Sequence, residues 1–173
     1  IISLAEVLAF EFLFPDEFSG INKIYAENTL MSAKLIAEKY TIPESHYIQV
    51  MDTAGKIFDK MKKVHGMGKR NKLLLQMAAI LHDSGKFVNV TDHQIHSYNL
   101  IKGSNIAGLT YDETDIVANI ALYHSHILPT KQDDNYRELN ASKKVLVSKL
   151  TAILRLADAL DRSRKQKLSD IDV

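Results

Sequence analysis

The sequence contains no cysteine, and this absence restricts the chemistry that the chain can carry. Disulfide bonds, thiolate nucleophiles and cysteine-ligated zinc are excluded, so any metal site must use histidine and carboxylate side chains. Charge of one sign is not in excess either: 22 lysine and arginine residues stand against 21 aspartate and glutamate residues, a formal net charge of +1. A strongly basic surface of the kind that binds duplex nucleic acid is therefore not expected.

Long hydrophobic runs are also missing. No apolar stretch approaches the roughly 18 to 20 residues that span a bilayer, and no basic leader precedes an apolar core and a cleavage site. We therefore expect a cytoplasmic protein without membrane association. At 173 residues, of which 46% are hydrophobic, the chain is long enough for one sizeable core.

The first quarter of the chain has a mixed pattern. Residues 1–14 are apolar and typical of a helix, and the following PDEFSG is typical of a loop. Residues 21–28, INKIYAEN, alternate in a way that favours a short strand. We interpret residues 1–42 as the tail of a preceding α/β domain.

From residue 43 to residue 173 every strong hydrophobic period is helical, which predicts an all-α domain. Four apolar stripes have the spacing of buried helix faces. Their members are Val50, Ala54, Ile57 and Met61; Leu74, Met77, Ala78 and Leu81; Ile116, Ile120 and Tyr123; and Leu146, Leu150, Ile153, Leu154 and Ala157.

Polar side chains share these stripes or directly follow them. The stretch LHDSGKFVNVTDHQIHSY, residues 81–98, follows the second stripe and holds three histidines and two of the chain's aspartates. An unpaired buried carboxylate costs several kcal/mol, so inward-pointing aspartates need a cation, and a divalent metal supplies one. The residues that this argument selects are His46, His82, Asp83, His124 and Asp158.

These residues predict a centre for one or two Mn, Fe, Mg, Zn or Ni ions. His46, His82, Asp83 and Asp158 would hold the first ion, and His96 and His124 would help to hold a second. Because residues three apart on a helix share a face, His93 competes with His96; we favour His96, which has Leu100 on its face. His65 and His126 are assigned no function.

Each residue also has an ordinary structural interpretation. An isolated histidine on an apolar face is usually a hydrogen-bonded core residue, and His82–Asp83 could be a helix-terminal pair. Asp158 could instead pair with Arg155 or Arg162. Lys86, after Gly85, could contact a phosphate beside the metal or be a surface lysine. The joint occurrence of these residues favours the metal interpretation.

In order, His46, His82–Asp83 and Asp158 resemble the signature of the HD superfamily of metal-dependent phosphohydrolases, and HDSGK resembles its HD-x-G-K form. Ser84 stands where many members carry an apolar residue. More narrowly, LLLQMAAILHDSGKFV, HQIHSYNLI, IALYH and LRLADALDRS are similar to the C-terminal helical domain of the exopolyphosphatase/guanosine pentaphosphate phosphatase family. NKIYAENTL is similar to the end of that family's actin-like region.

The resemblance implies an HD-type helical bundle over residues 43–173 that follows an actin-like domain. It implies hydrolysis of phosphoanhydride bonds in polyphosphate or guanosine pentaphosphate, with Asp83 as a ligand at the reacting centre and Lys86 offsetting phosphate charge. Two alternatives stay open: an accessory domain for polyphosphate binding or homodimer formation, and an HD phosphodiesterase acting on nucleotides.

Overall fold

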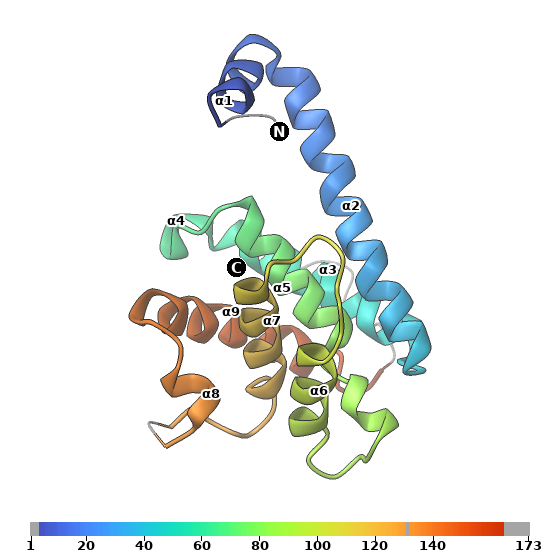
Figure 1. The fold of residues 1–173 in the computed structure, drawn as a ribbon. Helices are drawn as coiled ribbons and strands as arrows, with labels where there is room; N and C mark the ends of the chain where they lie inside the picture. Colours follow the sequence, from blue (N-terminus) through green and yellow to red (C-terminus); the bar gives the residue numbers. More distant parts are fainter. Residues whose placement is uncertain (1–3, 131, 165–173) are drawn as a thin grey trace.

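The computed structural model describes residues 4–130 and 132–164, and all regular structure in these residues is helical (Figure 1). The all-α fold class expected from the sequence is therefore confirmed. In chain order the segments are α1 (Leu4–Leu13), α2 (Pro15–Lys39), α3 (Glu44–Lys60), α4 (Lys62–His65), α5 (Lys69–Leu81), the 3-10 helix η1 (Ser84–Phe87), α6 (His93–Lys102), α7 (Tyr111–Leu122), α8 (Asp134–Arg137) and α9 (Ala141–Leu160).

Four helices form the body of the domain. α3 and α7 each pack against both α5 and α9, so the four helices enclose one apolar core. α5 lies deepest, because its buried residues occur on every side of the helix, as in a helix surrounded by others. They are Leu73, Leu74, Leu75, Met77, Ala78, Ala79, Ile80 and Leu81. α6 packs against α7 and against η1, which follows α5 directly.

The strand expected at residues 21–28 is wrong, because these residues lie inside helix α2. Ala26, Leu30, Ala33 and Ala37 recur at intervals of four, three and four residues, the spacing of one helix face, and this face is partly or fully buried. α2 packs against α5 through its later turns. The described residues thus contain no β-structure from a preceding domain, and the division of the chain at residue 42 stays a prediction.

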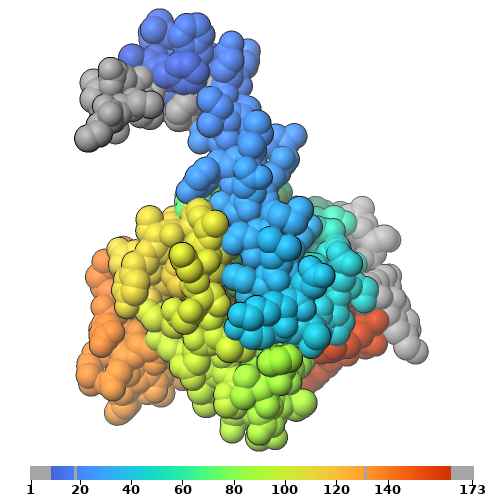
Figure 2. Space-filling model, turned by 45° about the vertical axis from the view of Figure 1, so that its right-hand side comes forward, coloured from blue at the N-terminus to red at the C-terminus, as the bar shows by residue number. Residues whose placement is uncertain are grey.

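The first turns of α2 stand clear of the body and carry α1 at their far end (Figures 1 and 2). The face of α2 opposite the buried one is apolar and exposed. Its large side chains are Ile21, Ile24, Met31 and Leu35. Within the part of the chain that the structure describes, no helix combines the length and the apolarity that crossing a membrane requires.

An ion pair joins the start of α7 to the start of α5. Thr110 and Glu113 form a capping box at the N-terminus of α7, which satisfies two backbone N–H groups there. The Glu113 carboxylate also accepts hydrogen bonds from Arg70 Nε and Nη2 at 2.6 and 2.7 Å. The bond from Arg70 is the main cause that lowers the pKa of Glu113 from 4.5 to about 2.

We expect this ion pair to make stability depend on acid pH. The folded pKa of Glu113 is depressed, so its contribution is complete above about pH 4.5 and is lost as the pH falls towards 2. Glu113→Gln should lower the free energy of unfolding by about 1–2 kcal/mol near pH 7 and by much less near pH 3. Urea unfolding of both proteins at each pH measures this difference. Asp59→Asn, in the more exposed pair with Lys72, is the control and should cost less than about 0.5 kcal/mol. An equal loss of stability at both pH values would contradict the conclusion that the Arg70–Glu113 pair causes the pH dependence.

Candidate metal centre

The predicted ligands lie at the ends of different helices, and the bundle brings those ends together. His46 lies in the first turn of α3, His82 and Asp83 directly follow α5, His124 follows α7 closely, and Asp158 lies in the last turn of α9. His46 and Asp158 share the buried faces of their helices but lie in the end turns, beyond the apolar core. One end of the bundle therefore collects polar groups from four helices without interrupting the core.

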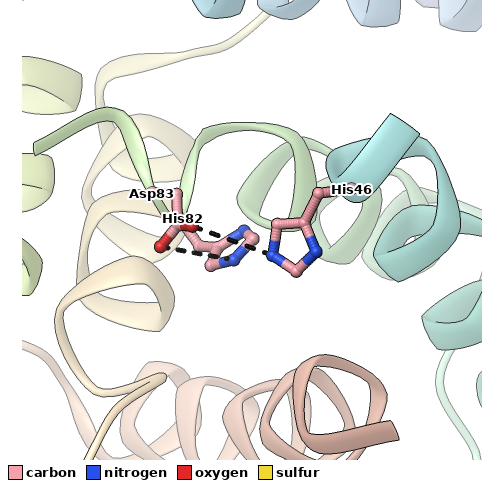
Figure 3. A group of neighbouring side chains, drawn as sticks. All are labelled: His46, His82 and Asp83. Atoms are coloured by element: carbon pink, nitrogen blue, oxygen red, sulfur yellow. Dashed lines mark ion pairs between the residues drawn. The ribbon is translucent and has the colours of Figure 1, made fainter. Parts of the chain in front are cut away.

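His46 and His82 direct their Nε2 atoms towards the same two carboxylates. Nε2 of His46 lies 3.4 Å from Asp158 Oδ1 and 3.7 Å from Asp83 Oδ2. Nε2 of His82 lies 3.5 Å from Asp158 Oδ1 and 3.6 Å from Asp83 Oδ1. Figure 3 shows the His46 ring, from α3, and the His82 and Asp83 side chains, from the end of α5, turned towards one another. These distances suit four groups around a common ion.

A second group forms around Asp83 Oδ1. Nε2 of His93, the first residue of α6, lies 3.4 Å from Asp83 Oδ1, and Nε2 of His124 lies 4.0 Å from the same atom. The two Nε2 atoms are 3.3 Å apart. Ligand atoms of Asp83, His93 and His124 all lie within 4.8 Å of one another, as do those of His46, His82 and Asp83 and those of His82, His124 and Asp158.

The ring orientations leave Nε2 of each histidine available to a cation. Nδ1 of His82 lies 2.7 Å from the Ala79 carbonyl oxygen, and Nδ1 of His124 lies 2.6 Å from that of Ala121. A carbonyl oxygen only accepts, so each Nδ1 carries the proton and each Nε2 of a neutral ring keeps its lone pair. Nδ1 of His93 faces the Val90 carbonyl oxygen at 3.2 Å in the same way.

A divalent cation fits this arrangement. Nε2 of His82 is fully buried and finds no hydrogen-bond partner among the described residues, which is costly for a polar atom unless an ion binds it. The facing Nε2 lone pairs of His93 and His124 repel each other unless a cation or a proton lies between them. Imidazole nitrogens and carboxylate oxygens are the donors that Mn, Fe, Zn, Ni and Mg ions accept in proteins.

The electrostatics of the site favour the ligand forms of Asp83, Asp158 and His124 near neutral pH. Burial alone would raise the pKa of Asp83, but the charge of His82 and the hydrogen bond from Lys86 hold it well below its usual range. The pKa of Asp158 is lowered against burial by His46 and His82. Burial lowers the pKa of His124 to about 3, so its ring is neutral. For His82, the charges of Asp83 and Asp158 outweigh burial and raise the pKa.

The structure places His93, and not His96, beside the other predicted ligands. His93 faces Asp83 and His124, whereas His96 belongs to none of the three groups in the described residues. The backbone of η1 explains this, because the Cβ of His96 packs against Gly85. His65 contacts none of these residues. Its Nε2 faces the Phe58 carbonyl oxygen, and its Nδ1 accepts the backbone N–H of Met67.

Asp158 and Lys86 both lie beside the predicted centre. Asp158 faces the two histidines, whereas Arg155 donates to the backbone carbonyls of Tyr123, Ser125 and Ile127. Arg155 thus fixes the turn that follows His124. Lys86 is one-third exposed, and its Nζ lies 2.5 Å from Asp83 Oδ2. It therefore lies beside the predicted centre.

Two residues that follow α9 contact the centre and were missed by sequence reasoning. Asp161 is buried, and its Oδ2 lies 2.8 Å from Nδ1 of His46. Its position three residues after Asp158, on the same helix face, was a usable signal. Arg164 donates to Asp83 Oδ2 at 3.0 Å. It lies beyond the helix with a positive φ of 53°, so no helical period indicated it.

A cavity of about 560 Å³ opens onto the centre. Asp83, His93, His124 and Asp158 face it, and cationic side chains surround them. The other lining residues are Lys86, Ser125, His126, Leu128, Arg155, Ala159 and Arg162. His46 and His82 are buried behind this surface. The negative charges of Asp83 and Asp158 would repel an anion from the centre unless a bound metal ion offset them.

A family model described as Ppx/GppA phosphatase, domain III, matches residues 30–172 of the chain. The match begins inside α2 and includes every residue of the centre. It covers most of the chain rather than a short motif, and it confirms the resemblance to the C-terminal helical domain of this family.

Proposed function

The chain belongs to the Ppx/GppA phosphatase family, and on this basis we propose that it is the metal-binding, HD-type helical domain of a phosphohydrolase that cleaves phosphoanhydride bonds. The observation that carries the proposal is the convergence of four histidine Nε2 atoms on Asp83 and Asp158 at the floor of a cation-lined cavity. The family match supports the class of reaction, and the geometry supports this centre as its location.

We propose that Asp83 is shared between two ions. His46, His82 and Asp158 would hold the first with Asp83, and His93 and His124 would hold the second. Such ions polarise a phosphoryl oxygen and activate water for in-line attack. Mn, Fe, Mg, Zn and Ni are all compatible with these donors. The Nδ1 hydrogen bonds keep the histidine rings in place before an ion binds, so little order has to be created on binding.

The cavity lining supports recognition of phosphate groups. Lys86 and Arg162 present charge to the cavity, and Ser125 adds a hydroxyl group. A polyphosphate chain or the phosphates of guanosine pentaphosphate offer the complementary charge. Among the described residues, the lining has no phenyl or phenol ring on which a base could stack, so we favour polyphosphate as the substrate.

The projecting part of α2 favours a second candidate role, that of an accessory domain. The exposed apolar face of Ile21, Ile24, Met31 and Leu35 leaves side chains in solvent that a neighbouring domain or a second copy of the chain would cover. Polyphosphate binding by the basic residues at the start of α5 has less support, because ion pairs already occupy two of them. Arg70 is paired with Glu113 and Lys72 with Asp59.

The proposal is tested by comparing two proteins: this chain alone and a longer protein that includes the actin-like domain. Hydrolysis is measured for both. Both proteins are given polyphosphate, guanosine pentaphosphate and a generic phosphodiester with Mn²⁺. His82→Ala, which removes a fully buried ligand, should abolish phosphate release by the chain alone. His65→Ala, a histidine outside the centre, is the matched control and should retain it.

The outcomes separate the two roles. Phosphate release by the chain that depends on His82 supports a working hydrolase. Absence of release by the chain, together with full activity of the longer protein carrying His82→Ala, would reject catalysis at this centre and leave the accessory role. Preferential hydrolysis of the phosphodiester, measured by release of its alcohol, would favour the nucleotide phosphodiesterase alternative.

A further inference from the structure

The four histidines of the centre do not all use the same kind of Nδ1 partner. His82, His93 and His124 face backbone carbonyls three residues earlier in the chain. His46 instead donates to the carboxylate of Asp161, 2.8 Å away, and both side chains are only 3% exposed. The position on the helix explains His82 and His124, whereas His93, which begins α6 as His46 nearly begins α3, still finds a carbonyl; at His46 the equivalent carbonyl is already occupied.

His82 and His124 directly follow the C-terminal turns of α5 and α7, where the last carbonyls have no intrahelical partner. Ala79 and Ala121 supply such carbonyls to the two rings. His46 lies at the N-terminal end of α3, where the orphan backbone groups are N–H donors and not acceptors. The carbonyl three residues before it, that of Pro43, already accepts the backbone N–H groups of His46 and Tyr47. An acceptor for His46 Nδ1 has to come from another element.

From this geometry we infer that Asp161 is a positioning residue that holds the proton of His46 on Nδ1 and so keeps Nε2 free for a metal ion. Two carboxylates, Asp158 at 3.4 Å and Asp83 at 3.7 Å, lie near Nε2 and compete for the same proton. If Nε2 carried the proton, its lone pair would be unavailable. The closer bond to Asp161 decides the competition in favour of Nδ1.

Asp161 also affects how strongly His46 can bind a metal ion. A carboxylate partner makes the ring more basic than a carbonyl partner does, and the loss of such an outer contact typically costs 10–100-fold in metal affinity. The function of Asp161 rests on the proposed metal centre, but its effect on the proton position does not need a metal.

The first test reads the proton position directly. In the metal-free chain, two-bond proton–nitrogen correlation spectra of labelled histidine should show His46 protonated at Nδ1. In Asp161→Ala the His46 signal should move towards the Nε2–H pattern, while His82 and His124, which bond to backbone carbonyls, keep theirs. An unchanged His46 pattern in Asp161→Ala would overturn the inference, whether or not the chain binds metal.

The second test measures Mn²⁺ affinity by chelator competition. Asp161→Ala should weaken binding by about 10–100-fold. Asp161→Asn keeps the shape and an acceptor oxygen but not the charge, so it should recover only part of the loss and bind about 3–10-fold more weakly than the original protein. Asp115→Asn, in the distant pair with Lys102, is the control and should not change affinity. If the alanine variant fails to fold, the asparagine variant decides: equal affinity would reject the role.

Failure of the inference and failure of the proposed function give different results. If the unmodified chain binds no metal ion but the His46 signal responds to Asp161→Ala, the metal centre is rejected and the positioning of the ring by Asp161 stands. If the chain binds metal and neither Asp161 variant differs from it, the centre stands and the role of Asp161 is rejected.

Discussion

Replacing Asp83 with alanine should abolish tight binding of divalent metal ions, with a loss in affinity of at least about 100-fold. The expected loss exceeds the 10–100-fold that removal of an outer contact causes, because Asp83 would bind the ions directly. Its two oxygens lie within 4.0 Å of Nε2 of all four histidines of the centre, and its ligand atom belongs to two of the three potential metal groups. Elemental analysis after incubation with Mn²⁺ and desalting, together with calorimetric titration, measures the effect.

The loss of metal affinity in Asp83→Ala should not result from unfolding of the variant. The cations that pair with Asp83, Lys86 and Arg164, are 33% and 43% exposed, so water can hydrate them when the carboxylate is removed. Asp59→Ala removes another aspartate from an ion pair with a lysine and is the matched control, for which metal binding should not change. Retention of one or two ions by Asp83→Ala would contradict the assignment of Asp83 as the shared ligand.

Replacing Gly85 with alanine should be among the most destabilising single changes in the chain. A Cβ at this position would lie 1.9 Å from the His93 carbonyl oxygen and 2.4 Å from the Ser97 nitrogen. Both are backbone atoms, so α6 would have to move away from η1. We expect a loss of about 3 kcal/mol or more in the free energy of unfolding, at the upper end of overpacking effects. Urea unfolding monitored by circular dichroism measures it.

A second readout connects this change to the centre. Gly85 N–H donates to Ser97 Oγ, whose hydroxyl donates to the His82 carbonyl oxygen. A shift of α6 would therefore disturb the HDSGK turn, and metal affinity should fall in any Gly85→Ala protein that still folds. Gly20→Ala is the control: nothing lies within 4 Å of the added carbon, so stability should be retained or rise by up to about 1 kcal/mol. A Gly85→Ala protein as stable as the original would show that α6 and η1 adapt freely.

Helical periodicity was sufficient to bring most of the centre together. His46 shares the face of Val50 and Ala54, and Asp158 shares that of Leu154, so the stripes that build the core also fix the direction of these side chains. The sequence could not decide between His93 and His96, because both lie on one face of the same helix. The decision depended on where α6 packs against η1, which is a tertiary contact.

The errors have equally local causes. Residues 21–28 contain Ile21, Ile24 and Tyr25, a short set of apolar residues that fits a strand about as well as a helix. The buried face that continues to Ala37 makes the segment helical. Asp161 was missed because a search for metal ligands does not look for the acceptor behind a ligand. The roles of the site residues stay predictions, and the experiments above test them.

The helix-end carbonyls that orient His82 and His124 have a consequence for how the centre can evolve. Every residue possesses a carbonyl, so no side-chain replacement at Ala79 or Ala121 deletes these two acceptors. The orientation of His46 is encoded differently, by one codon more than a hundred positions away, at Asp161. Selection could therefore tune or silence the centre in descendants through that single position, while all of its direct ligands remain intact in the gene.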